Sequence, residues 1–174
     1  MNSKLLFALT AACALGASAW AASPDTGRVT VNFDHPENFT DVKTSFNSDS
    51  ASSPYLDDFR RFIEAKAVKF LPEGQKLNVT FTDIDLAGDF EPWRGPSRQD
   101  TRIIKSIYIP RLKFKYQITD ATGAVVKEGQ ANLTDLNFQD DMPITVDSSE
   151  PLRYEKHMLN DWFHDTLKAP KKKK

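Results

Sequence analysis

Four carboxylates within nine residues are the strongest candidates for chemistry in this chain: Asp83, Asp85, Asp89 and Glu91. With Gly88 they open an Asp-x-Asp-x-x-Gly pattern, the beginning of an EF-hand calcium loop, in which hard oxygen ligands stand at alternate positions. The fifth position of that loop is Ala87 and the twelfth is Arg94. A side-chain ligand and the bidentate glutamate are therefore both missing, and we expect no metal site.

Acidic residues beside a glycine commonly form turns or pair with cations. Three arginines follow closely in the sequence, and we expect them to pair with the acids: Arg94, Arg98 and Arg102. Trp93 lies among them, and tryptophan and arginine are enriched where proteins bind partners, although a loop tryptophan can also cover the edge of a core. We interpret this region as a binding site that comprises Asp83, Asp85, Asp89, Trp93, Arg94 and Arg98.

Other catalytic patterns are absent from the sequence, so we assign no catalytic residue and no cofactor. His157 and His164 are seven residues apart on an expected helix, about 10 Å along its axis, which is too far for one zinc ion. The chain has no Gly-x-Ser-x-Gly element and no phosphate-binding glycine loop. A glycosidase needs only two carboxylates, but these are too common here to indicate one. The sequence thus favours a protein that is not an enzyme.

The first 21 residues have the features of a cleaved signal peptide. Lys4 precedes the uncharged apolar run 5–17, and small residues at 17–21 place the cleavage site between Ala19 and Ala21. The run is shorter than the ~20 residues of a membrane span. The only cysteine, Cys13, leaves with this segment. We therefore expect export to the periplasm, and a mature chain that has no disulfide and no transmembrane span.

The mature chain consists of an acidic main part and a basic C-terminal tail. Without the terminal lysines, the mature chain has a net charge of about −6, which argues against nucleic-acid binding. Residues 169–174 form a lysine-rich tail that we expect to be disordered. Such a tail can also contact anionic lipid.

Hydrophobic periodicity predicts one α+β domain over residues 22–168. Apolar residues alternate at 29–33, at 77–81, and over a long third strand that begins near Arg102 and passes Pro110. The turn 120–123 joins this strand to a fourth in a hairpin over 111–133. Helices begin at Pro54 and Pro151, and each has one apolar stripe. We expect a two-layer sandwich in the order β-α-β-β-β-α: a mostly antiparallel four-stranded sheet with two helices on one face.

The segment Leu77-Asn78-Val79-Thr80-Phe81-Thr82-Asp83-Ile84-Asp85-Leu86-Ala87-Gly88 resembles a family of exported proteins of Gram-negative bacteria, the domain of unknown function 3016. Shorter segments agree as well, such as Ile109-Pro110-Arg111-Leu112 and Asp161-Trp162-Phe163. The resemblance covers nearly the whole mature chain. It implies an exported single-domain protein, and it supplies no activity, ligand or catalytic residue.

These observations lead to one functional hypothesis and two alternatives. The first is a non-catalytic periplasmic accessory or binding protein that contacts a protein partner in the envelope. The second is a metal-dependent or carbohydrate-directed enzyme that uses the acidic loop from Asp83 to Glu91. The third is a peripheral membrane protein held by the lysine tail, Lys171 to Lys174. The oligomeric state does not follow from the sequence.

Overall fold

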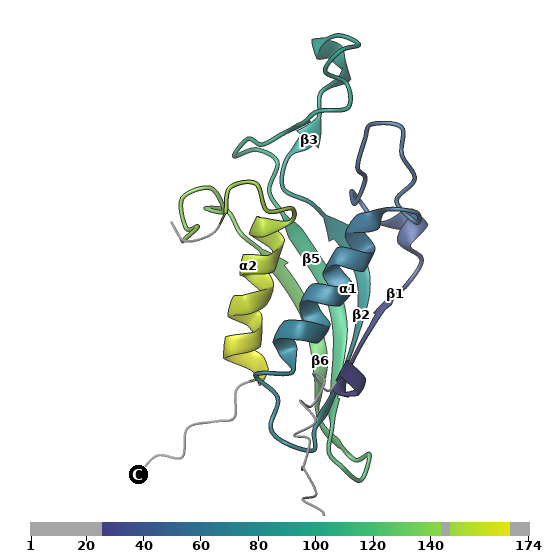
Figure 1. Cartoon of the computed structure of the whole chain (residues 1–174), viewed down its shortest axis with the longest axis vertical. Coiled ribbons are helices and arrows are strands. Elements are labelled where there is room, and N and C mark those ends of the chain that lie inside the picture. Colours follow the sequence, from purple (N-terminus) through teal and green to yellow (C-terminus); the bar gives the residue numbers. More distant parts are fainter. Residues whose placement is uncertain (1–25, 144–146, 168–174) are drawn as a thin grey trace, which may run out of the picture.

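The computed structural model describes residues 26–143 and 147–167. The expected signal peptide and lysine tail lie outside the described residues and stay predictions. One sheet and two helices make up the body of the molecule (Figure 1). The strands are β1 (Val29–Phe33), β2 (Lys76–Asp85), β5 (Arg111–Thr119) and β6 (Val125–Thr134), and the helices are α1 (Pro54–Ala67) and α2 (Arg153–Trp162).

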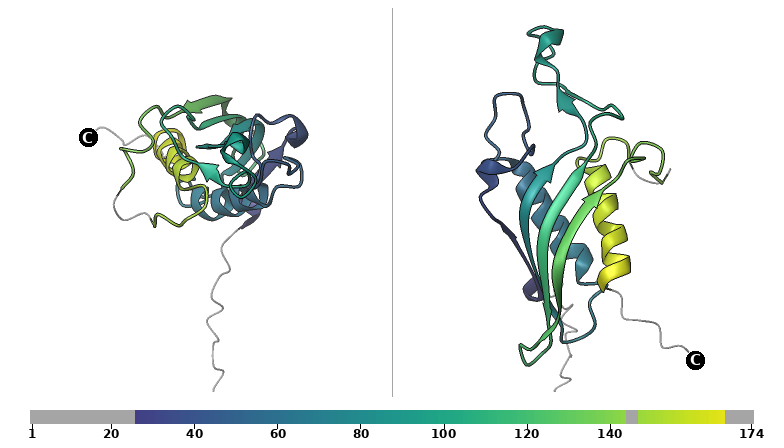
Figure 2. Two further views of the ribbon diagram at one scale, coloured as in Figure 1. Left: turned by 90° about the horizontal axis from the view of Figure 1, so that it is seen from above. Right: turned by 180° about the vertical axis from the view of Figure 1, so that it is seen from behind.

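The sheet has the strand order β1-β2-β5-β6. Strand β1 is parallel to β2, while β2 pairs antiparallel with β5, and β5 with β6. The α+β class, the two helices and the mostly antiparallel four-stranded sheet are thus confirmed, as is the hairpin over 111–133. Both helices lie on one side of the sheet, and none of the helices described covers the other side (Figure 2).

Helix α1 begins where the sequence indicates. The hydroxyl of Ser53 accepts a hydrogen bond from the backbone N–H of Tyr55, and Pro54 occupies the first helical position, where the lack of an N–H costs nothing. Helix α2 continues into a π-helical turn, η4 (Phe163–Leu167). Short 3₁₀ helices occur at η1 (Thr26–Arg28), η2 (Pro36–Asn38) and η3 (Pro92–Arg94).

Aromatic side chains fill the space between the sheet and the helices. Phe81 contacts Phe114 across two strands, with ring centroids 5.1 Å apart, and Phe59 of α1 packs on Phe81. Trp162 of α2 meets Phe114 edge-on at 4.9 Å. No helix among the described residues is long and apolar enough to cross a membrane.

The expected long third strand is wrong in its first part. Arg102–Ile103 form strand β4, which pairs with β3 (Asp89–Phe90) in a separate two-stranded sheet. The chain then turns, and β5 begins only at Arg111. Pro110, which has no N–H for a strand ladder, lies at this boundary. Residues 89–109 form an arm that projects past the end of the main sheet (Figures 1 and 2).

Candidate functional site

The first two carboxylates of the expected site lie on strand β2 rather than in a loop. A bulge after Phe81 shifts the register, so that β2 continues to Asp85 with Asp83 and Asp85 beside β5. Asp83 accepts hydrogen bonds from the backbone and hydroxyl of Thr40 and from Lys113 Nζ at 2.9 Å. Burial opposes ionisation of Asp83, yet these hydrogen bonds lower its pKa overall.

The cationic partner of Asp85 is Arg111, whose Nη1 lies 3.4 Å from a carboxylate oxygen. The expectation that Asp83 and Asp85 pair with Arg94, Arg98 or Arg102 is therefore wrong. Cross-strand neighbours reach these acids first, because residues opposite each other in an antiparallel sheet have Cβ atoms only ~5 Å apart. Burial raises the pKa of Asp85, and Arg111 opposes that shift.

The arm is fixed to the body by Arg102. Its guanidinium donates to both carboxylate oxygens of Asp41, at 2.8 and 3.1 Å, and to the backbone oxygens of Gly88 and Lys43. It also lies 4.6 Å from the centroid of the Phe90 ring. This bidentate pair joins β4 of the arm to the segment between β1 and α1, two parts of the chain that are far apart in sequence.

At the root of the arm, the position of Gly88 has no room for a side chain. Gly88 has φ +81, and a Cβ atom there would lie 2.6 Å from Ile104 Cδ1 and 2.8 Å from the backbone oxygen of Ile103. The preceding residue, Ala87, donates its N–H to the buried carboxyl of Glu155 on α2 at 2.7 Å. Burial raises the pKa of Glu155. The start of the arm is thus fixed on one side by the hydrogen bond to α2 and on the other by close packing against Ile103 and Ile104.

A buried carboxylate holds the outer half of the arm together. Glu91 is only 1 % exposed, and it accepts hydrogen bonds from Arg94 Nε, from Lys105 Nζ and from the hydroxyl of Tyr108 at 2.8 Å. These donors come from both sides of the arm. We infer that the arm is a preformed element, because its single buried carboxylate is satisfied from three directions.

The stability of the arm should depend on pH through Glu91. The hydrogen bond from Lys105, followed by those from Tyr108 and Arg94, lowers the pKa of Glu91 from 4.5 to about 2, although burial opposes the shift. A lowered pKa means that this stabilisation is complete above pH 4.5 and is lost as the pH falls toward 2. We expect the amide NMR resonances of Arg94 and Lys105 to move over this range. Glu91→Gln should abolish the transition, and its persistence in that variant would contradict the assignment.

The expected binding residues Trp93, Arg94 and Arg98 lie in the outer part of the arm, and Trp93 is 72 % exposed. Among the described residues, seven large apolar side chains are exposed. Four of these lie on the arm or on the adjacent loop 43–50: Phe46, Trp93, Ile104 and Ile107. Asp100 joins the two parts by accepting the N–H of Phe46 at 3.2 Å. We call the arm and this loop together the arm end.

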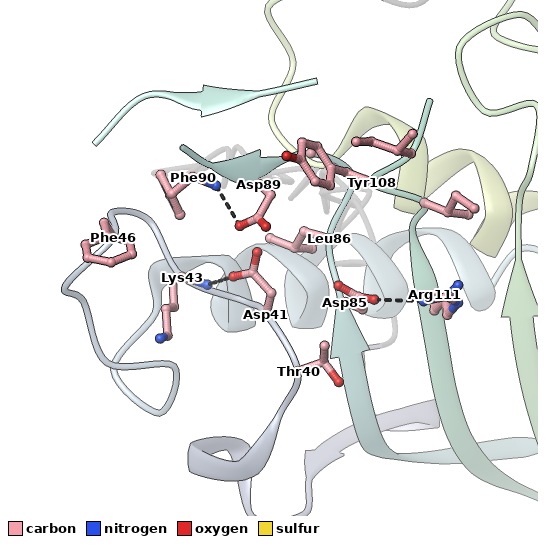
Figure 3. Close-up of a pocket in the computed structure, with 13 residues that line it drawn as sticks. Thr40, Asp41, Lys43, Phe46, Asp85, Leu86, Asp89, Phe90, Tyr108 and Arg111 are labelled. Carbon is pink, nitrogen blue, oxygen red and sulfur yellow. Dashed lines mark hydrogen bonds and ion pairs between the residues drawn. The ribbon is translucent and has the colours of Figure 1, made fainter. Parts of the chain in front are cut away.

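A cleft of about 350 Å³ lies at the root of the arm (Figure 3). Asp85 and Asp89 line it, together with Asp41. Its remaining walls combine cations with apolar groups, among them Lys43, Arg111, Phe46, Leu86, Phe90, Ile107 and Tyr108. Asp83 and Arg98 do not line this cleft. The structure therefore divides the expected site into a polar cleft at the root and an exposed tip that carries Trp93.

Within residues 26–143 and 147–167, no group of three or more His, Cys, Asp or Glu side chains is arranged to hold a metal ion. The pairing of Asp83 with Lys113 and of Asp85 with Arg111 places cations where a metal would need free oxygens. Saturating calcium, magnesium, manganese or zinc should leave the melting temperature unchanged. A ligand at ~100 times its dissociation constant would add ~2.7 kcal/mol. A reproducible rise that Asp85→Asn removes would contradict this expectation.

Sequence reasoning missed two residues that organise the arm end. Asp41, the partner of Arg102, lies in a polar loop without a motif. Phe46 is a single aromatic residue in the same loop. Glu91 was grouped with the possible ligands, although its function is to hold the arm. The expectation that nearby arginines pair with the acids is confirmed for Glu91, which pairs with Arg94.

A family profile described as "Protein of unknown function (DUF3016)" matches residues 27–165 of this chain. The matched range includes all the strands of the main sheet, both α-helices and the whole arm. No curated protein shows a significant match to the sequence.

Proposed function

This chain belongs to the DUF3016 family, and we propose that it is a periplasmic protein that binds another component of the envelope through its arm end. Export is inferred from the signal-like sequence of residues 1–21. The observation that carries the binding function is the exposure of Trp93 on an arm that Arg102 and Glu91 hold in place. A tryptophan that is exposed on an ordered arm, with three further exposed apolar side chains at the arm end, favours a surface that binds a partner.

The ordered arm favours binding, because the free protein has already lost the conformational entropy that a flexible arm would lose on binding. Each flexible side chain that becomes fixed on binding costs about 0.5–1.5 kcal/mol. Here Glu91 and Arg102 fix the arm before any partner arrives. Tryptophan and arginine are also the side chains most enriched at the centres of interfaces.

The same geometry supports a non-catalytic role over an enzyme that uses the acidic residues. A general acid or base needs a carboxylate that reaches a substrate, and it is most effective with a pKa near the working pH. Asp83 and Glu91 have lowered pKa values and are occupied by cations. Asp85 has a raised pKa, but Arg111 lies beside it.

Site-specific photocrosslinking in cells tests the binding function. A photoreactive amino acid at position 93 or 107 should form adducts in the periplasm of the host. The matched control is Val126 on β6, which is 54 % exposed and lies outside the arm end. Adducts from the arm positions, but not from position 126, are expected. If the arm positions give no adduct with either protein or lipid, the proposed function is wrong.

A further inference from the structure

We propose that the component bound by the arm end is the surface of an anionic phospholipid membrane. In this arrangement Trp93 enters the headgroup region and Arg98 faces the lipid phosphates. This inference rests on the proposed function, since it identifies what the same surface binds. It does not involve the lysine tail.

The exposed tryptophan at the tip of the arm suits a membrane interface. Trp93 is 72 % exposed, whereas the exposed side chains of Ile104 and Ile107 lie at the root of the arm, beside Gly88 and the cleft. Tryptophan is enriched at the boundary between water and lipid, where its apolar ring is buried and its N–H keeps a polar partner. Because the arm projects beyond the sheet (Figure 1), Trp93 can enter such a boundary while the body stays in water.

The charge of the arm is complementary to an anionic surface. The arm, residues 89–109, contains four cations and three carboxylates and therefore has a net charge of +1, whereas the whole chain has a net charge of −1. Glu91 pairs with both Arg94 and Lys105, which leaves one positive charge in excess. The Arg98 side chain has no ion-pair or hydrogen-bond partner among the described residues. At physiological ionic strength, screening over ~8 Å weakens repulsion of the acidic body, which lies behind the arm.

The size of the projecting surface favours lipid over a protein partner. A stable protein interface buries about 800 Å² on each side and involves about 20–30 residues. The tip of the arm consists of η3 and the short turn that leads to β4, with one exposed tryptophan. The headgroup region of a membrane accommodates tryptophan side chains, which are enriched at that level.

Vesicle binding tests this inference on purified protein that comprises residues 22–174. We would measure co-sedimentation with vesicles of phosphatidylglycerol and phosphatidylethanolamine, and with vesicles of phosphatidylcholine alone. The wild-type protein should prefer the anionic vesicles. Trp93→Ala should weaken partitioning about ten-fold or more, and Arg98→Gln about five-fold. Lys69→Gln, which removes an exposed charge at the far end of α1, should have much less effect than Arg98→Gln.

Two further measurements distinguish vesicle binding by the arm from vesicle binding by the lysine tail or other parts of the protein. A variant that lacks Lys171 to Lys174 should keep its sensitivity to Trp93→Ala. Brominated lipid should quench the fluorescence that Trp93→Phe removes, since Trp162 is then the only remaining tryptophan and is buried. The inference is overturned if anionic vesicles do not bind, if phosphatidylcholine binds equally well, or if deletion of the tail abolishes binding. A protein adduct at position 93 in cells, without vesicle binding, would leave the proposed function intact and refute lipid as its ligand.

Discussion

Replacing Trp162 by alanine should lower the free energy of unfolding by about 3 to 5 kcal/mol, as large-to-small changes in a protein core do. Trp162 is 8 % exposed, and its ring meets Phe114 at 4.9 Å and Tyr116 at 5.1 Å. The change would leave a cavity between α2 and the sheet. Chemical denaturation monitored by circular dichroism measures the loss.

Leu136→Ala is the matched control for this prediction, because Leu136 is 69 % exposed and its removal opens no cavity. We expect a change within about 0.5 kcal/mol for this surface substitution. If Trp162→Ala unfolds at the same denaturant concentration as Leu136→Ala, the packing of α2 on the sheet is described incorrectly.

Replacing Arg102 by alanine should cost about 3 kcal/mol and release the arm. The substitution leaves the carboxylate of Asp41, which is only 15 % exposed, without its cation. It also leaves the backbone oxygens of Gly88 and Lys43 without the guanidinium. Breaking a buried ion pair by removing one partner typically costs 3–5 kcal/mol, and the partial exposure of this pair places it at the low end. Denaturation measures the cost, and hydrogen exchange at the amides of residues 89–109 measures the release.

Arg60→Ala provides the comparison, since Arg60 pairs with Asp57 on the exposed side of α1. Exposed ion pairs contribute about 0–1 kcal/mol, so this variant should remain close to the wild type. Faster exchange in the arm for Arg102→Ala, with unchanged exchange for Arg60→Ala, is the expected pattern. Equal exchange in both variants would show that Arg102 does not hold the arm.

The elements of the body could be predicted because their signals are local. The alternation at Val29, Val31 and Phe33 is the pattern of a strand with one buried face, and Ser53-Pro54 is a helix start. The hairpin between β5 and β6 followed from turn residues around Gly123, which has φ +88. In each case the residues that decide the structure are close together in the chain.

The arm could not be predicted, because its structure depends on distant contacts. Ile103 and Ile104 have the apolar character of a strand, and the sequence places them in one strand with Ile109. What separates β4 from β5 is pairing with Asp89–Phe90 and the bond from Arg102 to Asp41, 61 residues away in sequence. Residue type alone indicates neither contact.

The residues of the expected site lie in two different parts of the fold, and the sequence did not indicate this separation. Trp93, Arg94 and Arg98 do lie together in the exposed part of the arm. Asp83 and Asp85, which are near them in sequence, belong instead to β2, where β5 provides Lys113 and Arg111. A one-residue bulge in β2 decides this, and its effect on which side chains meet is not visible in the sequence.

Cysteine protection in cells tests directly whether a partner covers the arm end, and it is feasible because the mature chain is expected to contain no cysteine of its own. Single cysteines at positions 93, 107 and 126 would be labelled with a maleimide in intact periplasm and in the purified protein. We expect slower labelling in the periplasm at positions 93 and 107 than in the purified protein, and equal rates at position 126. Equal rates at all three positions would mean that nothing covers the arm end, and would contradict the claim that it is a binding surface.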